Sequence, residues 1–219
     1  MYEYVKDKEF LTRAYGYCAD IVNQLVQELK NYDIYARMNV VGSMKRNMVT
    51  QNAKQAIDFD FNLLIENPGN YYRERDLKEA IRKAFNEILA RNGWGDCSDS
   101  RSVLTTEQRV FKTGNKTPFS IDVCIVKRDQ LGLHRLVHRK TGWTSMDEWY
   151  WNLVPNTQNL HEREVALKPD YWLEVREVYL DKKNMYLSRQ QEDDHQSFNC
   201  YIEAVNEVYD RRIRGTVWL

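Results

Sequence analysis

The sequence is poor in glycine and proline and has no long apolar run. Its 219 residues include only 9 Gly and 4 Pro, which argues against long disordered or low-complexity segments. No apolar stretch is long enough to cross a bilayer, and residues 1–6 lack the layout of a secretory signal. We therefore expect a globular, cytoplasmic protein with no membrane partner.

Cysteine is also scarce. The chain has four scattered cysteines with no CxxC pair among them: Cys18, Cys97, Cys124 and Cys200. Their spacing alone leaves two disulfides open, but free and mostly buried thiols in a cytosolic protein are the favoured interpretation. His134 and His138 lie four residues apart without a companion Cys or Glu in a recognisable pattern. We interpret them as solvated or capping side chains and not as zinc ligands.

The chain has no excess of either charge. Lys and Arg total 32, and Asp and Glu total 32, so the formal net charge is zero. This balance excludes a strong global attraction to nucleic acid or to an anionic membrane. A local basic segment spans residues 127–141 and contains Lys127, Arg128, His134, Arg135, His138, Arg139 and Lys140. It could bind nucleic acid or a triphosphate, although a solvated surface is the favoured reading.

Aromatic residues are abundant, with 14 Tyr, 6 Trp and 7 Phe. Several gather in the second half of the chain: Trp143, Trp149, Tyr150, Trp151, Tyr171 and Trp172. Core and interface packing is the commonest use of such side chains, and stacking on a nucleobase is the alternative. The sequence leaves the role of this group open.

The most informative stretch is residues 40–65. An apolar run ends in Gly42-Ser43, and Asp58 and Asp60 then alternate with bulky apolar residues. In a strand, alternate side chains share a face, so the two carboxylates point the same way. Neighbouring like charges favour a cation between them, and Mg²⁺ prefers carboxylate oxygens. Gly42 permits close approach of the backbone to a phosphate.

These residues resemble the signature of the DNA polymerase β-like nucleotidyltransferase superfamily. That signature is Gly-Gly or Gly-Ser, a spacer, and two acidic residues flanking a hydrophobic one, with a third carboxylate on a later strand. Asp122, within residues 119–126, matches the third carboxylate. Arg46 and Thr50 are similar to the Gly-Ser-x-x-Arg-x-Thr form of oligoadenylate synthetases and bacterial cyclic-oligonucleotide synthases. Relative to the signature, residues 52–55 form a small insertion in the spacer.

The resemblance implies an α/β (α+β) nucleotidyltransferase fold, with a mixed sheet flanked by helices. It implies that Asp58, Asp60 and Asp122 hold two Mg²⁺ or Mn²⁺ ions and that an NTP, ATP or GTP, is the substrate. A further role for Asp122 as a general base stays open. The residues expected to bind the nucleotide phosphates are Gly42, Ser43, Lys45, Arg46 and Lys182.

Hydrophobic periodicity predicts the elements. Helices are expected over residues 8–30, 73–89 and, with breaks, 160–209; strands over 34–41, 56–65 and 118–126. A short helix over residues 44–50, one or two strands within 102–111, a hairpin turn at 113–116 and a helix capped by Ser145 with Glu148 complete the prediction. Residues 1–130 are expected to form the catalytic core, and residues 131–219 a helical subdomain that completes the cleft.

The acceptor stays open at this point. A nucleotide second-messenger or oligonucleotide synthase is one hypothesis, and a minimal transferase acting on a small molecule, a protein or an RNA end is another. A non-catalytic nucleotide- or RNA-binding relative is the hypothesis from a different class. A nucleic acid or protein could serve as acceptor or activator.

Overall fold

The computed structural model describes residues 1–155, 158–187 and 197–215 and contains two compact units. The sheet unit comprises Lys6–Val49 and Lys54–Val154, and the helical unit comprises Met1–Val5, Thr50–Ala53 and Pro155–Leu219. This division differs from the expected ranges 1–130 and 131–219. The expected boundary falls inside a hairpin in which Asp129 pairs with Gly132, and the first five residues belong to the helical unit.

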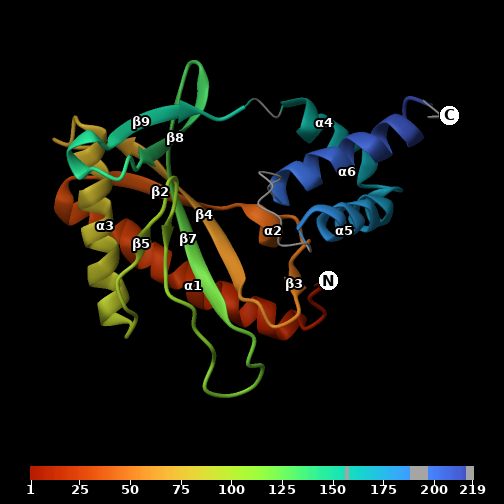
Figure 1. Ribbon diagram of the computed structural model, residues 1–219, viewed down its shortest axis with the longest axis horizontal. Helices are drawn as coiled ribbons and strands as arrows, with labels where there is room; N and C mark the ends of the chain where they lie inside the picture. Colours follow the sequence, from red (N-terminus) through yellow and green to blue (C-terminus); the bar gives the residue numbers. More distant parts are fainter. Residues whose placement is uncertain (156–157, 188–196, 216–219) are drawn as a thin grey trace. The chain divides into compact units, whose positions relative to one another are not determined.

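One mixed sheet forms the centre of the sheet unit (Figure 1). Its order is β2 (Tyr35–Val40), β4 (Ile57–Asn67), β7 (Phe119–Asp129), β6 (Leu104–Thr105) and β5 (Ser98–Asp99). Strand β8 (Gly132–Arg139) also pairs with β7, and β9 (Glu148–Leu153) pairs with β8. Strands β4 and β7 run parallel, whereas their other pairings are antiparallel. The mixed α/β architecture confirms the predicted fold class.

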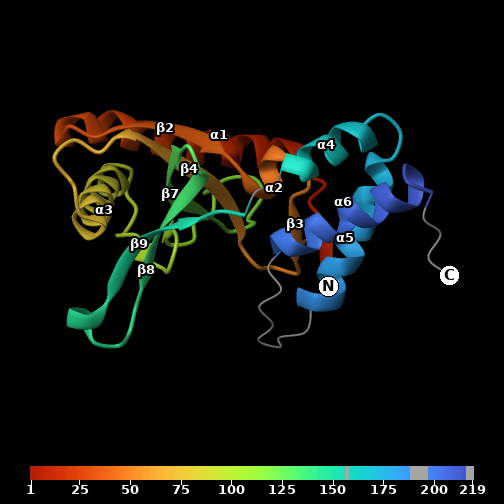
Figure 2. The same cartoon turned by 90° about the horizontal axis from the view of Figure 1, so that it is seen from above.

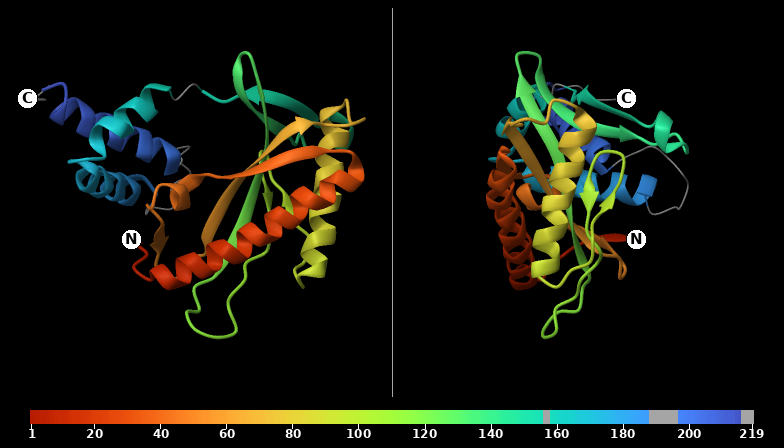
Figure 3. Two further views of the ribbon diagram at one scale, coloured as in Figure 1. Left: turned by 180° about the vertical axis from the view of Figure 1, so that it is seen from behind. Right: turned by 90° about the vertical axis from the view of Figure 1, so that its left-hand side faces the viewer.

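Two long helices, α1 (Lys8–Glu28) and α3 (Glu74–Arg91), cover one face of this sheet (Figure 3). Phe59 and Phe61 are buried on that face, and Tyr15 of α1 stacks on Phe61 with ring centroids 6.1 Å apart. Alternation along β4 and β7 therefore places apolar side chains under the helices. The remaining side chains, which include the predicted acids, face the other side.

The helix boundaries follow from local chemistry. Asp7 accepts a hydrogen bond from the backbone N–H of Phe10 at 2.9 Å and so caps α1. A 3₁₀ turn, η1 (Leu29–Tyr32), continues α1 and ends at Asp33, whose φ is 57°. Helix α3 ends at the predicted Asn92-Gly93, and Gly93 has φ 73°. The helices predicted over residues 8–30 and 73–89 are thus confirmed.

Two predictions made from short polar segments are wrong in detail. The helix expected over residues 44–50 is instead α2 (Gly42–Lys45), because Asn47 adopts φ 55° and ends it, and Thr50 begins the strand β3 (Thr50–Asn52). The one or two strands expected within residues 102–111 are present as one strand, the two-residue β6, whereas the hairpin turn expected at residues 113–116 is not formed as predicted. The chain does reverse before β7, but through a long loop closed by a bridge between Arg109 and Phe119.

The predicted capped helix at Ser145 and Glu148 is also wrong. A single 3₁₀ turn, η2 (Thr144–Met146), is followed by β9, which begins at Glu148. Aromatic residues favour strands, and the register pairs Trp149 with His138 and Tyr150 with Val137. The basic segment of residues 127–141 therefore covers the end of β7 and the whole of β8. Figure 2 shows β8 and β9 side by side, with η2 at their far tip.

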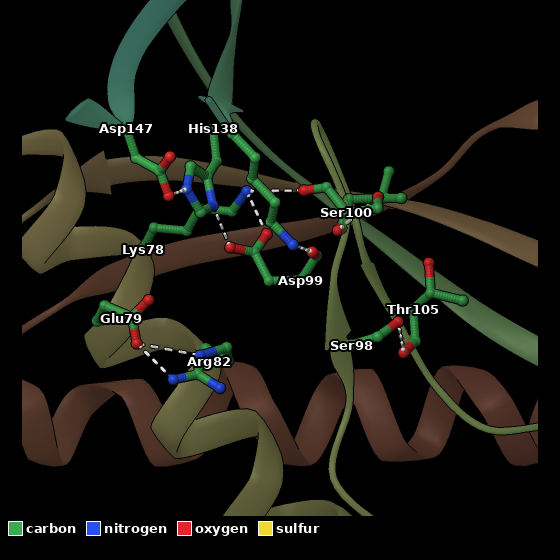
Figure 4. Close-up of polar contacts among 11 residues, drawn as sticks. Lys78, Glu79, Arg82, Ser98, Asp99, Ser100, Thr105, His138 and Asp147 are labelled. Atoms are coloured by element: carbon green, nitrogen blue, oxygen red, sulfur yellow. Dashed lines mark hydrogen bonds and ion pairs between the residues drawn. The ribbon is translucent and has the colours of Figure 1, made fainter. Parts of the chain in front are cut away.

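The two histidines of β8 are buried, which corrects their interpretation as solvated or capping side chains. The ring of His138 lies between two carboxylates, with Nδ1 2.6 Å from Asp99 and Nε2 3.0 Å from Asp147 (Figure 4). Lys78 of α3, which is only 1% exposed, forms an ion pair with Asp99 at 2.6 Å. Trp149 stacks on His138 at 4.2 Å. This network links α3, β5 and the β8–β9 hairpin.

The helical unit contains α4 (Gln158–Leu167), α5 (Trp172–Leu187) and α6 (Ser197–Arg212), which confirms the helices predicted over residues 160–209. A small antiparallel sheet of β1 (Tyr2–Tyr4) and β3 joins them. Asn184 of α5 accepts a hydrogen bond from the Tyr2 N–H at 2.6 Å and donates one to the Tyr2 carbonyl at 3.0 Å. The polar link predicted at residues 190–195 lies outside the described residues.

The cysteines agree with the expectation drawn from their spacing. All four cysteines are buried and free, as predicted. In the part of the chain that the structure describes, no helix combines the length and the apolar character that crossing a membrane requires.

Candidate active site on the polar face of the sheet

The loop after β2 passes directly against Asp60. The Val41 N–H donates to the carbonyl of Asp60 at 3.0 Å, and Gly42 adopts φ 67°. A Cβ atom at Gly42 would lie 2.0 Å from the Oδ2 atom of Asp60. Both the left-handed backbone and the missing side chain are therefore required here. The structure thus brings Gly42 and Ser43 next to the part of β4 that carries Asp58 and Asp60.

The parallel register of β4 and β7 assembles the predicted acids. Asp58 pairs with Ser120, and Asp60 pairs with Asp122. Paired residues on adjacent strands share a face of the sheet, so the three carboxylates form a group on the face opposite α1 and α3. This pairing depends on residues that are far apart in the sequence.

Two hydroxyl groups hold these acids. Ser120, which is buried, donates from Oγ to Oδ1 of Asp58 at 2.5 Å. Burial raises the pKa of Asp122, a hydrogen bond from Thr105 opposes that rise, and the negative charge of Asp58 adds to it. Thr105 lies directly across from Asp122 on β6. Ser120 could be seen from the sequence as a polar neighbour on the same face, but Thr105 carried no such signal.

The donor chemistry of this group fits a hard divalent cation. The Oδ1 atom of Asp122 is buried and has no hydrogen-bond partner among the described residues. An unpaired buried carboxylate oxygen beside another negative charge favours a bound cation. Within the described residues, however, no group of three or more His, Cys, Asp or Glu side chains is arranged to hold a metal ion in this structure. The carboxylates are the residue type that Mg²⁺ or Mn²⁺ prefers, but in this structure they are not gathered into a complete set of metal ligands.

The predicted basic residues are in different settings. Lys45 is exposed at the end of α2, and Arg46 is half-buried immediately after it. Lys182 lies on α5 in the helical unit, with ion pairs to Glu207 at 2.9 Å and Glu203 at 3.6 Å. Burial lowers the pKa of Lys182, but Glu207 and Glu203 raise it by more. The structure thus brings Lys45 and Arg46 next to Gly42-Ser43, while Lys182 stays a prediction from the sequence.

The aromatic group predicted from the second half of the chain is divided between the units. Trp149 packs on His138, and the Lys127 amine lies 4.7 Å from the ring centroid of Trp151. Trp143 is 73% exposed near η2. Tyr171 and Trp172 belong to the helical unit. Within the sheet unit, Trp149 therefore serves packing, in line with the commoner use of such side chains.

Comparison with known proteins identifies the fold through solved structures alone. No family model matches the sequence, and no curated protein matches it significantly. Solved structures do match. The Vibrio cholerae DncV cyclic AMP-GMP synthase, bound to a linear intermediate, is 14% identical with a TM-score of 0.56, over 85% of this chain and 49% of that one.

Two further solved structures match the chain in the same way. Escherichia coli MS115-1 CdnC with ATP is 14% identical with a TM-score of 0.58, over 97% of this chain and 63% of that one. The STING-associated CdnE c-di-GMP synthase of Capnocytophaga granulosa is 14% identical with a TM-score of 0.56, over 92% of this chain and 61% of that one. The chain thus spans between 49% and 63% of the length of these three proteins. It has the nucleotidyltransferase fold that cyclic-oligonucleotide synthases share, which confirms the predicted resemblance at the level of fold.

Proposed function

We propose that this protein is a metal-dependent nucleotidyltransferase. It transfers an NMP from an NTP, ATP or GTP, to a hydroxyl acceptor and releases pyrophosphate. The observation that carries the proposal is the pairing of Asp60 with Asp122 on neighbouring strands, together with the close contact between Gly42 and Asp60. A phosphate-accessible loop beside clustered carboxylates is the arrangement that phosphoryl and nucleotidyl transfer requires.

In this proposal each acid has a role. Asp58, Asp60 and Asp122 hold Mg²⁺ or Mn²⁺, which would neutralise phosphate charge and lower the pKa of the acceptor hydroxyl. The Ser120 hydroxyl fixes the orientation of Asp58. Asp122, whose pKa burial raises, is suited to accept the proton that the hydroxyl loses. The acceptor oxygen then forms a bond to the α-phosphorus as the bond to pyrophosphate breaks.

The leaving pyrophosphate needs positive partners. The backbone N–H groups of Gly42 and Ser43 lie next to the carboxylates, and Lys45 and Arg46 follow them directly. Donors placed where negative charge develops stabilise the transition state. Lys182 is proposed for the same task from the sequence. Cytoplasmic location and a nucleic-acid or protein activator also stay predictions.

The synthesis of a nucleotide second messenger or an oligonucleotide is the form of this activity that we favour. The observation behind this choice is that two of the structural neighbours are named as cyclic-dinucleotide synthases. With 14% identity, that likeness shows the fold and supports the activity only as a proposal.

The test is release of pyrophosphate. Purified protein is incubated with each of the four NTPs and with Mg²⁺ or Mn²⁺, and the products are resolved by mass spectrometry. We expect release from at least one NTP and at least a thousandfold loss of rate in the double variant Asp58→Asn with Asp60→Asn, because the metal would lose two ligands. Thermal unfolding checks that the variant is folded. Absence of both turnover and metal-dependent NTP binding would leave a non-catalytic protein with this fold.

A further inference from the structure

The buried side chain of His138 lies at the centre of a charge network that the proposed function does not use. It is only 8% exposed, and the side chains of Asp99 and Asp147 are 11% and 9% exposed. Its Nδ1 atom lies 2.6 Å from a carboxylate oxygen of Asp99, and its Nε2 atom lies 3.0 Å from one of Asp147. Figure 4 shows the ring between these two groups, which come from β5 and from the residue before β9. Both ring nitrogens therefore face a carboxylate.

Two carboxylates at these distances require two donors from the ring. A neutral imidazole has one N–H group and one lone pair, whereas an imidazolium has two N–H groups. With a neutral ring, a nitrogen lone pair would face a buried carboxylate oxygen, and no hydrogen would lie between the two atoms. Burying polar atoms without a hydrogen bond is costly. The geometry therefore favours the imidazolium form of His138.

The charges of the network balance only in that form. The Lys78 amine lies 2.6 Å from Asp99. Asp147 accepts hydrogen bonds from the N–H and the hydroxyl of Thr141 at 2.8 Å and 3.2 Å. The Thr141 N–H first, and then His138, lower the pKa of Asp147, which favours its carboxylate form. Two cations then face two anions, whereas a neutral ring would leave one buried negative charge uncompensated.

The other charged side chains nearby do not replace this cation. Those next to the network are Arg75, Glu79 and Arg82 of α3 and Lys140 after β8. The Arg75 guanidinium lies 5.0 Å from the ring centroid of Trp149, which stacks on His138. Arg82 pairs with Glu79 at 2.6 Å, and Lys140 donates to the backbone carbonyl of Asp99 at 2.5 Å. Among the described residues, the positive charge against Asp147 is therefore that of His138.

Asp147 connects the network to the tip of the β8–β9 hairpin. One of its carboxylate oxygens accepts from the Thr141 N–H, and the other faces His138. Residues 141–146 are exposed and include Trp143 and Met146, which are 73% and 65% exposed. The buried contact between Asp147 and His138 thus fastens an otherwise exposed turn to β8.

We propose that His138 is a pH-sensitive latch that holds residues 141–147 against β8. The latch is closed while the ring binds two protons. As the pH rises, the Nε2 proton passes to solvent, the nitrogen lone pair faces the Asp147 carboxylate, and the tip is released. Histidine is the side chain whose charge ordinarily changes between about pH 5 and 8. The latch does not depend on the proposed transferase activity.

The sign of the effect follows from proton binding. In the closed latch, the folded protein binds a proton that the unfolded chain releases more readily. The stability that the latch contributes is therefore present at low pH and is lost as the pH rises.

Proton occupancy of the ring gives the first test. The whole chain is labelled with ¹⁵N in its histidine rings, and the ring nitrogens are followed by NMR from about pH 5 to about pH 9. His161, at an exposed position of α4, provides the internal comparison. We expect His138 to keep protons on both nitrogens above the pH at which His161 loses one. Loss of a proton from His138 at the same pH as His161, or at a lower pH, overturns the proposal.

The variant Asp147→Asn distinguishes a latch from a contact that only supports the fold. Its side-chain carbonyl can still accept from the Thr141 N–H, while its amide can donate to a neutral Nε2 atom. Hydrogen exchange of the Thr141 N–H, corrected for the intrinsic effect of pH, reports whether the tip is held. As His138 loses its proton, we expect Thr141 in the wild type to lose about tenfold protection or more, because a charge-assisted hydrogen bond is broken. Asp147→Asn should show no such loss.

Glu148→Gln is the matched control, because Glu148 is the neighbouring carboxylate but is exposed. It should behave as the wild type does. Unchanged exchange of Thr141 in the wild type while His138 loses its proton would refute the latch and leave a fixed buried network. The same pH-dependent loss in Asp147→Asn would also refute it, because a group other than the His138–Asp147 pair would then release the tip. Urea unfolding checks that the variants are folded, and the wild-type series decides the matter if Asp147→Asn is not.

Discussion

At the scale of single residues, Gly42 tolerates the least change. Its φ of 67° is unfavourable for other residues, and a Cβ atom would collide with the Asp60 carboxylate. We expect Gly42→Ala to lower the free energy of unfolding by about 1–3 kcal/mol and to abolish turnover by displacing Asp60. Urea unfolding and pyrophosphate release measure the two effects.

Gly16 provides the control for that substitution. It lies within α1, and a Cβ atom there would meet no atom within 4 Å. Gly16→Ala should raise stability by about 0.5–1 kcal/mol, since alanine is favoured over glycine inside a helix. If Gly42→Ala behaved like Gly16→Ala in both assays, the close approach of the loop to Asp60 would not hold in solution.

Asp122 should make the metal-free protein less stable at neutral pH. Its pKa is raised in the folded state, first by burial. The folded protein therefore binds the proton of the Asp122 carboxyl group more tightly than the unfolded chain does. Its contribution to the free energy of unfolding accordingly decreases as pH rises from the ordinary carboxyl pKa through the raised one. We expect Asp122→Asn to be more stable than wild type at pH 7 in chelator, with the difference disappearing in acid.

Asp7 provides the comparison, because its substitution is expected to change stability at neutral pH in the opposite direction. Hydrogen bonds from Asn115 and from the Phe10 N–H lower the pKa of Asp7, so Asp7→Asn should destabilise at neutral pH. Urea unfolding over a pH series measures both variants. A loss of stability in Asp122→Asn at pH 7 would show that the carboxylate is compensated within the protein, and would weaken the case for a cation.

At the scale of elements, the buried network around His138 holds the β8–β9 hairpin to α3. Lys78→Met would remove the lysine partner of the Asp99 carboxylate, which is 11% exposed, and leave only the His138 ring beside it. We expect a loss of about 3–5 kcal/mol in the free energy of unfolding. Lys83→Met, at an exposed position of the same helix, should change it by less than about 0.5 kcal/mol.

A second substitution tests the cause of that loss. Asp99→Asn introduced into Lys78→Met removes the carboxylate charge that lost its lysine partner and should recover part of the stability. Both measurements use urea unfolding of the whole chain. Lys78→Met with wild-type stability would mean that Asp99 is neutralised by His138 alone.

Local patterns in the sequence predict β4, β7, α1 and α3, because each carries its own alternation or helical period over ten or more residues. They also predict which acids share a face. The sequence could not reveal the pairing of Asp60 with Asp122, because register is a property of two strands and not of either one. The β8–β9 hairpin was missed because charges and aromatic residues obscure its alternation, and Ser145 with Glu148 imitates a helix start.

At the scale of the whole molecule, the sequence suggests a simple division into an N-terminal core and a C-terminal helical part. The structure instead assigns Met1–Val5 and Thr50–Ala53 to the helical unit. A three-residue strand such as β1 carries too little pattern to be recognised, and its position depends on Asn184 far along the chain. The candidate site residues in the sheet unit could be named from the sequence, whereas the partner Thr105 required the fold.

The attachment of β1 to α5 has a consequence for synthesis on the ribosome. Tyr2 precedes the whole sheet unit in the chain, whereas its partner Asn184 leaves the ribosome only after that unit has been translated. Strand β1 can pair with β3 once residues 50–52 have been made, but the hydrogen bonds of Tyr2 to α5 form only after Asn184 has been made. The helical unit can therefore complete its folding only after translation has passed α5, because its segment Met1–Val5 is separated from α5 by the whole sheet unit.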